Sequence, residues 1–289
     1  MTIAANGPES KQRFKKRNNI NYDQFDDYTQ IVPIPSESHP NIDNAVMISG
    51  FPSAGMIGSI VCAQLIEQLG MHQIAFVYSK YIMPGVLWIG GKLRHPFRIY
   101  CNKDGSVCVL TCDVPVFADA MDSISNAITM WCNQNKVSKL LVASGIYPEN
   151  IQPFPKDFAS RSAFLIKSDS NSKNAITEKG KVNGTQTPRF SFIGGLPGQL
   201  LGTCVVQSIP CLAILVPTLS FAPDPEGAAL AIEAIGNMVP KAKVSYSHLK
   251  QEADRIKKQL SELAKLQSRL LKNDRAENMS HDDAEHIYK

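Results

Sequence analysis

Short apolar runs rich in β-forming residues alternate with helical patterns from Ala45 to Met238, and this alternation constrains the fold more than any other feature. An order of this kind is typical of a sheet that helices cover on both faces. We therefore predict an α/β protein, a three-layer α/β/α sandwich whose sheet is largely parallel with some antiparallel additions. The expected strands are Ala45–Ser49, Ile74–Tyr78, Phe97–Cys101, Val107–Asp113, Lys139–Ser144, Ala163–Lys167 and Cys211–Val216, and the expected helices are Met56–Leu69, Asp119–Asn135, Gly198–Gln207 and Pro225–Met238.

The composition indicates a folded protein without a membrane segment. The chain has 289 residues, of which 44% are hydrophobic and 19% are charged, and its formal net charge is +4. This suffices for one large domain or two small ones and is too apolar for a disordered chain. The longest aliphatic runs, such as Cys211–Val216, are much shorter than the ~20 residues of a membrane span. The first twenty residues contain no apolar signal segment, so we expect a cytoplasmic protein whose seven cysteines are reduced and mostly in the core.

The N-terminal part of the chain differs in composition from the rest. Residues 1–40 are polar and predict a flexible extension, whereas residues 41–240 form the predicted α/β/α core domain. The extension carries a basic cluster at Lys11–Arg17, but the acidic residues of Asp23–Asp27 follow at once and cancel its field beyond roughly 10 Å at cellular salt. We therefore expect no nucleic-acid partner.

Residues 241–273 predict an amphipathic C-terminal helix that extends the sandwich. Its apolar positions follow alternating spacings of four and three residues, the seam of a coiled coil, with one interruption at Gln267. The helix, whose seam extends over about three heptads, could pair with a helix of another subunit in a homo-oligomer or could lie on its own domain. The seam consists of Leu249, Ala253, Ile256, Leu260, Leu263 and Leu270.

The turn from Gly50 to Gly58, which reads Gly-Phe-Pro-Ser-Ala-Gly-Met-Ile-Gly, lies between an expected strand and an expected helix. Backbone amides at such a helix start could hold a phosphate or a nucleotide with help from His95 and Arg98, and an enzyme of this kind is the alternative function. However, the turn has neither the Lys-Ser/Thr pair of a Walker loop nor the G-x-G-x-x-G spacing. The other interpretation is structural: Gly55 and the last glycine let the helix pack closely on the sheet, and Pro52 shapes the turn.

The remaining chemically active residues form no recognisable catalytic set. The sequence contains no nucleophile elbow, no Cys–His pair and no cluster of carboxylates. Cys108 and Cys112 have neither a second cysteine pair nor a histidine nearby that would complete a zinc site. Asp113 and Asp224 lie close to prolines and fit helix capping and turns. We therefore expect no cofactor, no metal and no enzymatic activity.

The last three residues, Ile287, Tyr288 and Lys289, end a polar segment, residues 274–289, with five acidic and two basic residues and a net charge of −3. We expect this segment to be a flexible tether. Its tip suits a docking peptide: the carboxylate would pair with a lysine in a partner's pocket, which the tyrosine ring and the apolar side chain would fill. Several copies on one oligomer would bind much more tightly than one.

Three stretches of the chain resemble the family of the second proteasome assembly chaperone, and within it the archaeal homologues. They are Gly50–Leu69, Met83–Tyr100 and Ile209–Pro225, and with the pattern between them the resemblance spans about residues 43–265. The most specific part is the G-F-P-x-x-G-x-x-G-S motif at Gly50–Ser59. The resemblance implies a phosphorylase-like α/β/α sandwich and, in the chaperone members, no demonstrated enzymatic chemistry.

The resemblance also implies a partner. Some archaeal relatives end in a hydrophobic residue, a tyrosine and any residue, and this tail docks into pockets between α-subunits of the 20S proteasome; Ile287, Tyr288 and Lys289 match it in that order. We therefore expect a homo-oligomeric proteasome assembly chaperone or ATP-independent proteasome activator that docks this tail in the 20S α-ring. The chain departs from its relatives at Ser53, where a glycine is common, and in the extension of residues 1–40, which has no counterpart.

Overall fold

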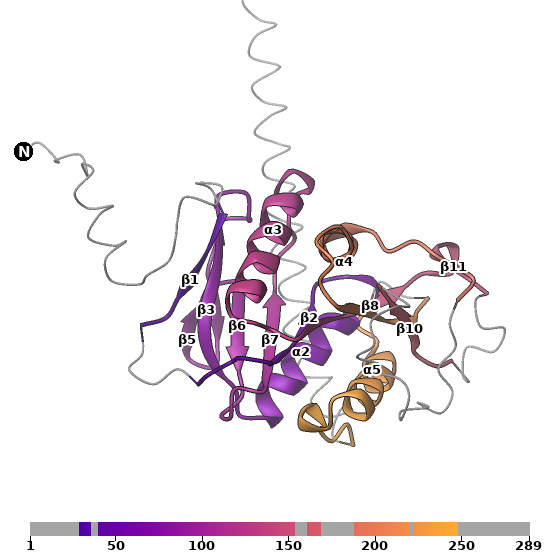
Figure 1. Cartoon of the computed structure of the whole chain (residues 1–289). Helices are drawn as coiled ribbons and strands as arrows, with labels where there is room; N and C mark the ends of the chain where they lie inside the picture. The colour runs from indigo at the N-terminus through magenta and orange to yellow at the C-terminus, as the bar shows by residue number, and fades with distance from the viewer. Residues whose placement is uncertain (1–28, 36–39, 154–160, 169–187, 220–221, 248–289) are drawn as a thin grey trace, which may run out of the picture.

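An eight-stranded mixed sheet forms the centre of the computed structural model, which describes residues 29–35, 40–153, 161–168, 188–219 and 222–247 (Figure 1). Its strands, in spatial order, are β1 (Thr29–Pro33), β3 (His72–Ser79), β6 (Phe97–Cys101), β7 (Val107–Cys112), β2 (Val46–Gly50), β8 (Lys139–Ile146), β12 (Cys211–Pro217) and β10 (Phe164–Lys167). The four central strands, from β7 to β12, are mutually parallel, and every pair outside them is antiparallel. The sheet is thus mixed rather than largely parallel, because β1, β3 and β6 on one side and β10 on the other add antiparallel pairs to a parallel centre.

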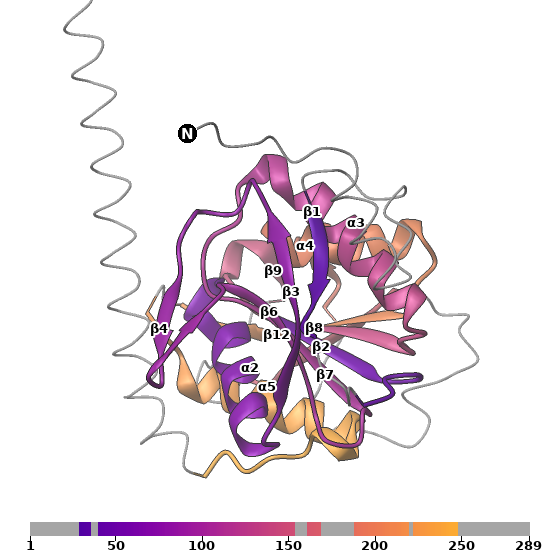
Figure 2. The ribbon, with the colours of Figure 1, turned by 90° about the vertical axis from the view of Figure 1, so that its left-hand side faces the viewer.

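Helices cover both faces of this sheet. Helices α2 (Ile57–Gln68) and α5 (Pro225–Met238) pack together on one face, and α3 (Ala118–Gln134) and α4 (Gly195–Val206) pack together on the other (Figure 2). Each helix pair encloses its own buried apolar cluster against the sheet, with Leu110 facing α3 and α4 and Val109 facing α2 and α5. This alternation of directions along one strand confirms the predicted α/β/α sandwich.

Strand β1 corrects the predicted boundary of the N-terminal extension. Residues Thr29–Pro33 pair antiparallel with β3 along an edge of the sheet, and the Thr29 hydroxyl hydrogen-bonds with those of Ser79 and Ser123, each at 2.9 Å. The prediction of a flexible segment up to residue 40 is therefore wrong for this strand. The rest of the extension, up to residue 28, lies outside the described residues.

Several short elements are also absent from the sequence-based expectations. They are the hairpin of β4 (Leu87–Ile89) and β5 (Lys92–Arg94), the pair of β9 (Ile151–Gln152) and β11 (Phe190–Ser191), and the 3-10 turns η2 (Ala54–Met56), η3 (Pro148–Asn150) and η5 (Pro240–Ala242). After η5, residues 243–247 have no helical structure. The predicted C-terminal helix therefore does not begin at residue 241. The remainder of the predicted helix lies outside the described residues.

Two further predictions concern the burial of the cysteines and the lack of a membrane-spanning segment. All seven cysteines are buried and free, which agrees with their expected place in the core. Among the residues that the structure describes, no helix combines the length and the apolar character needed to cross a membrane.

Candidate functional site

The carboxyl ends of the parallel strands β7, β2, β8 and β12 meet at one edge of the sheet, which we call the carboxyl edge. Sheets of this type commonly bind their ligands at this edge. The Gly50–Gly58 turn, Asp113 and Asp224 all lie here, together with Arg98 near the start of β6. The fold thus brings most of the chemically active residues named from the sequence to one region.

The Gly50–Gly58 turn brings α2 into backbone contact with the sheet. A Cβ atom added at Gly50 would lie 2.1 Å from the carbonyl oxygen of Gly58, and one at Gly58 would lie 2.5 Å from that of Ala143 on β8. Gly55 has a φ of 62°, which favours glycine. Its added Cβ would lie 3.0 Å from both Asp224 and Thr218. Close packing thus accounts for these three glycines without a ligand.

Asp224 connects this turn to α5 and to β12. Its backbone N–H donates to the carbonyl oxygen of Gly55 at 2.8 Å. Its carboxylate accepts hydrogen bonds from the Gly227 N–H at 2.9 Å, which caps α5 as predicted, and from the Arg161 guanidinium at 2.7 Å. Arg161 also donates to the carbonyl oxygen of Pro217 at 3.3 Å. Because the Arg161 and Asp224 side chains are only 8% and 10% exposed, this is a buried ion pair that fixes the end of β12.

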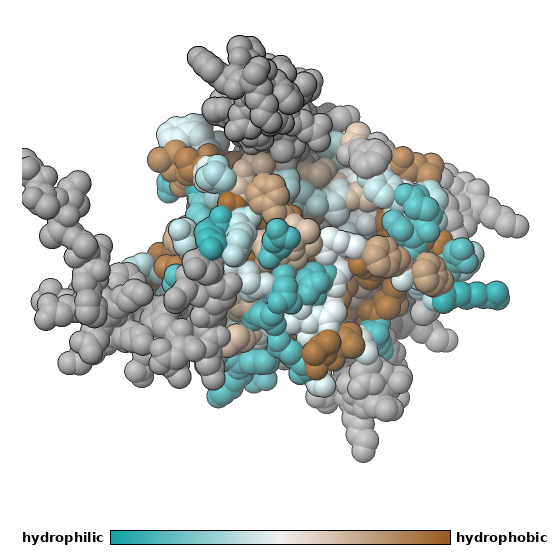
Figure 3. All heavy atoms as spheres, turned by 90° about the horizontal axis from the view of Figure 1, so that it is seen from above, coloured by the Kyte–Doolittle hydropathy of each residue, from teal (hydrophilic) through white to brown (hydrophobic). Residues whose placement is uncertain are grey.

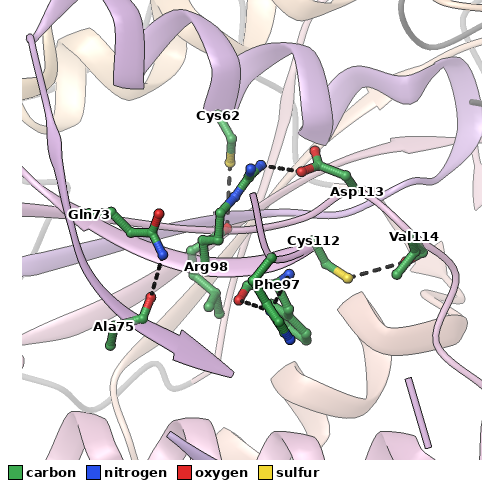
Figure 4. Close-up of polar contacts among 10 residues, drawn as sticks. Cys62, Gln73, Ala75, Phe97, Arg98, Cys112, Asp113 and Val114 are labelled. Atoms are coloured by element: carbon green, nitrogen blue, oxygen red, sulfur yellow. Dashed lines mark hydrogen bonds and ion pairs between the residues drawn. The ribbon is translucent and has the colours of Figure 1, made fainter. Parts of the chain in front are cut away.

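A second buried ion pair joins Arg98 to Asp113. The Arg98 side chain extends from β6 toward Asp113, beneath the helix that carries Cys62 (Figure 4). The two side chains are 6% and 16% exposed, and the guanidinium also lies 5.7 Å from the centre of the Tyr100 ring. Burial raises the pKa of Asp113, although the charge of Arg98 opposes this shift. The Arg98 guanidinium is therefore engaged by a carboxylate of its own chain.

These contacts change the interpretation of three residues. Arg98 could hold an anion according to the sequence, but it binds Asp113. Asp113 does not cap a helix, because the N-cap residue of α3 is Phe117. His95 accepts the Phe97 N–H at its Nδ1 atom, at 3.1 Å, and therefore stabilises its own turn. The Gly50–Gly58 turn, His95 and Arg98 are thus engaged by contacts within the chain, which favours the structural interpretation of the turn.

A pocket of about 250 Å³ lies at the carboxyl edge on the face of α3 and α4. Phe51 and Pro52 form one wall, Val114 and Val116 a second, and Leu196 a third. The lining is mostly apolar and fits a hydrophobic group better than a phosphate. This pocket is not predicted from the sequence, and α4, which contributes to its lining, begins three residues before its predicted start. The signal for that start is the Gly194-Gly195 pair with a proline two residues later.

The β4–β5 hairpin carries an exposed apolar face. Trp88 and Leu93 are directly paired across the hairpin and are 71% and 67% exposed, whereas Leu87, which points to the other side, is buried. The hairpin stands away from the main sheet in Figure 2. From above, hydrophobic side chains reach the surface in separate patches rather than in one continuous band (Figure 3).

The docking tail and the helical seam lie outside the described residues. The tail is Ile287, Tyr288 and Lys289, and the seam is Leu249, Ala253, Ile256, Leu260, Leu263 and Leu270. Both assignments therefore remain predictions from the sequence.

The chain matches a known protein family, and its fold is similar to those of several solved structures. The model of the PAC2 family matches residues 47–264. A protein of unknown function from Thermoplasma acidophilum has a similar structure, with a TM-score of 0.70 and 25% identity over 95% of this chain and all of that one. Two proteins of Pyrococcus furiosus are also similar in fold. PbaA, described as an archaeal homolog of proteasome-assembly chaperone, has a TM-score of 0.67 and 23% identity over 81% of this chain and 96% of its own. PbaB, described as an archaeal proteasome activator, has a TM-score of 0.63 and 17% identity over 82% of this chain and 99% of its own.

Proposed function

Because the chain belongs to the PAC2 family, we propose that it acts as a proteasome assembly chaperone or as an ATP-independent proteasome activator. The match of the family model to residues 47–264 carries this proposal. It is supported by the names of two proteins of similar fold, one a homolog of proteasome-assembly chaperone and the other a proteasome activator. The partner would be the 20S proteasome, and the protein would act by binding rather than by catalysis.

The proposed contact is the tail Ile287-Tyr288-Lys289, which would enter pockets between α-subunits of the 20S ring. The α-carboxylate would pair with a pocket lysine, and the Tyr288 ring would supply most of the buried apolar surface. Residues 248–286, 39 in number, connect the folded body to the tip. The body would therefore serve as the carrier of the tail.

A homo-oligomer is part of the proposal, because one tail alone would bind weakly. Tails on the same assembly act at a high effective concentration, so that several weak contacts give tight binding. The predicted seam from Leu249 to Leu270 is a means of pairing subunits. Light scattering after size-exclusion chromatography, with and without residues 248–289, measures the subunit number and the contribution of this region.

A pull-down tests the docking mechanism. The immobilised full-length protein is expected to retain the 20S proteasome of its source organism, and a chain without residues 287–289 is expected to lose it. A matched control reorders the last three residues to Lys-Ile-Tyr, which keeps composition and charge and should also lose binding. Equal retention by all three chains would contradict tail docking but not the proteasome as partner. Peptide hydrolysis by assembled 20S particles then distinguishes gate activation from assistance in assembly.

A further inference from the structure

Five of the seven cysteines gather near the amino ends of the parallel strands, on the face covered by α3 and α4. Pairing of adjacent strands aligns one residue from each of five strands in a single row, which runs Cys101, Cys108, Met47, Leu140 and Cys211. Helix α3 contributes Cys132 and helix α4 contributes Cys204 to the same buried cluster. We call these five cysteines the thiol row.

Cys132 lies in the middle of the thiol row. Its thiol is 3.7 Å from the sulfur of Met47, which is the strand neighbour of Cys108. It is also close enough to Cys108 and to Cys204 to affect the ionisation of both thiols. Burial raises the pKa of Cys132 to about 12, so this central thiol stays protonated.

The first pair in the row, Cys101 and Cys108, is directly opposed across the β6–β7 hairpin. The neighbouring pair, Asn102 and Val107, is hydrogen-bonded, because the Asn102 N–H donates to the Val107 carbonyl at 3.0 Å. By the alternation of an antiparallel ladder, Cys101 and Cys108 form a non-hydrogen-bonded pair, in which Cα atoms are about 4.5 Å apart. That separation falls within the range of about 4.4–6.8 Å found in disulfides.

The second pair is formed by Cys204, in the last turn of α4, and Cys211, the first residue of β12. The Ile209 N–H donates to the Cys204 carbonyl at 2.8 Å, which folds the connection back on itself. The Cys211 thiol lies 4.0 Å from the carbonyl oxygen of Leu201, one helical turn before Cys204. The Cys204 and Cys211 side chains are close enough to affect each other's ionisation.

We propose that Cys204–Cys211 and Cys101–Cys108 are two sites of reversible disulfide formation, which a low-molecular-weight disulfide oxidises. The Cys211 thiolate attacks one sulfur of the small disulfide, forms a mixed disulfide and releases one small thiolate. The Cys204 thiol then loses its proton and attacks the Cys211 sulfur, which releases the second small thiolate. The two cysteines are oxidised by two electrons and the small disulfide is reduced to two thiols. Cys101 and Cys108 react in the same way.

The two sites differ in access, which sets their order of reaction. Cys211 is 7% exposed, whereas Cys101, Cys108 and Cys204 are fully buried. Contact with Cys204, and to a lesser degree with Ser168, lowers the pKa of Cys211 from its ordinary value. Thiolates are the attacking species in such exchange. The Cys204–Cys211 bridge therefore forms first, and the hairpin bridge requires local opening.

Disulfide mapping tests the inference on the full-length protein. The reduced protein is incubated with oxidised glutathione, quenched in acid, blocked with N-ethylmaleimide in denaturant, digested and analysed by mass spectrometry. The expected products are a Cys204–Cys211 bridge at early times and a Cys101–Cys108 bridge later, and dithiothreitol should reverse both. Retention of all seven thiols by the folded protein, or bridges that join other cysteines, would overturn the proposal.

Variants separate the two sites. Cys211→Ser should abolish the early bridge and leave the hairpin bridge, and Cys108→Ser should do the reverse. Cys62→Ser and Cys112→Ser are matched controls, because each of these buried thiols donates to a backbone carbonyl, that of Leu110 or Val114. Both controls should form both bridges at the wild-type rate. If a control abolishes either bridge, the assigned pairing is wrong.

Discussion

Arg98 and Asp113 form an ion pair between the first residues of β6 and the loop after β7, with both side chains largely withdrawn from water. The register of the hairpin places Arg98 opposite Thr111, two residues before Asp113. A buried guanidinium without its carboxylate would carry an uncompensated charge. The pair thus holds the β7 loop, one wall of the apolar pocket, against the sheet.

Removing the carboxylate should be costly. Asp113→Ala is expected to lower the free energy of unfolding by about 3–5 kcal/mol, because it leaves the Arg98 charge buried and unpaired. Chemical denaturation measures this loss. The double variant Arg98→Met/Asp113→Leu should recover most of it, since apolar residues of similar volume replace both charges.

The exposed ion pair of Lys136 and Asp43 is the control. Its side chains are 74% and 36% exposed, and its atoms are 3.2 Å apart. Asp43→Ala should change the free energy of unfolding by no more than about 1 kcal/mol. Similar losses from both single variants would show that burial does not distinguish the two pairs.

The pH dependence of stability should reveal the lowered pKa of Asp104. Hydrogen bonds from Ser106, and then from Lys241, lower the pKa of this exposed carboxyl. Its stabilising contribution is present above the unfolded pKa of about 4 and is lost as the pH falls below it. Unfolding measured from pH 2 to 7 for the wild type and Asp104→Asn should show this acid loss, which salt reduces because the group is exposed.

The contact between Gly50 and Gly58 predicts a strong response to one methyl group. In Gly50→Ala, the added Cβ would lie 2.1 Å from the Gly58 carbonyl oxygen, so α2 must shift away from the sheet. We expect a loss of at least about 1–3 kcal/mol in the free energy of unfolding. Gly202→Ala in α4 is the matched control: no atom lies within 4 Å of its added Cβ, and it should stabilise by about 0.4–1 kcal/mol.

Nucleotides should not stabilise the protein. Arg98 is paired with Asp113, and the glycines of the Gly50–Gly58 turn are occupied by packing contacts. A nucleotide at 100 times its dissociation constant would add about 2.7 kcal/mol to the free energy of unfolding. A thermal-shift screen with ATP, ADP and inorganic phosphate should show no change, and a clear rise in Tm would revive the enzyme hypothesis.

Two substitutions of Tyr288 should weaken proteasome binding to different degrees. Tyr288→Phe keeps the ring and removes one hydrogen bond, which is worth about 0.5–1.5 kcal/mol, so a loss of about 2- to 13-fold per tail is expected. Tyr288→Ala also removes the ring and should lose considerably more. Binding of tail peptides to the 20S particle measures both values, and equal affinities would exclude the tyrosine as an anchor.

The sequence predicts correctly those helices and strands whose ends are defined by neighbouring residues in the chain. Helix α5 occupies the predicted range Pro225–Met238, because a capping aspartate and an N1 proline define its start. Strand β1 was missed, since its five residues come after a polar segment and gain their burial only by pairing with β3. The β4–β5 hairpin was missed because its strands have three residues each and expose large apolar side chains.

The candidate site was less predictable for a related reason. The role of Asp113 depends on Arg98, fifteen residues away, and on a strand register that no spacing rule specifies. Arg161 precedes β10 and Asp224 follows β12, so their ion pair depends on the pairing of these two strands. The alignment of the cysteines likewise requires the order of five strands, of which only two adjoin in sequence. Patterns of a few residues identify such side chains but not their partners.

The thiol row gives the two ends of the parallel strands unlike sensitivities. The end with the two buried guanidinium–carboxylate pairs holds neither of the proposed bridges, so a change of redox potential would leave those pairs intact. The opposite end holds both bridges and, in the β6–β7 turn, the exposed pair of Asp104 and Lys241, so oxidants, acid and salt would all act there. Oxidants would thus reach the backbone layer from one rim only.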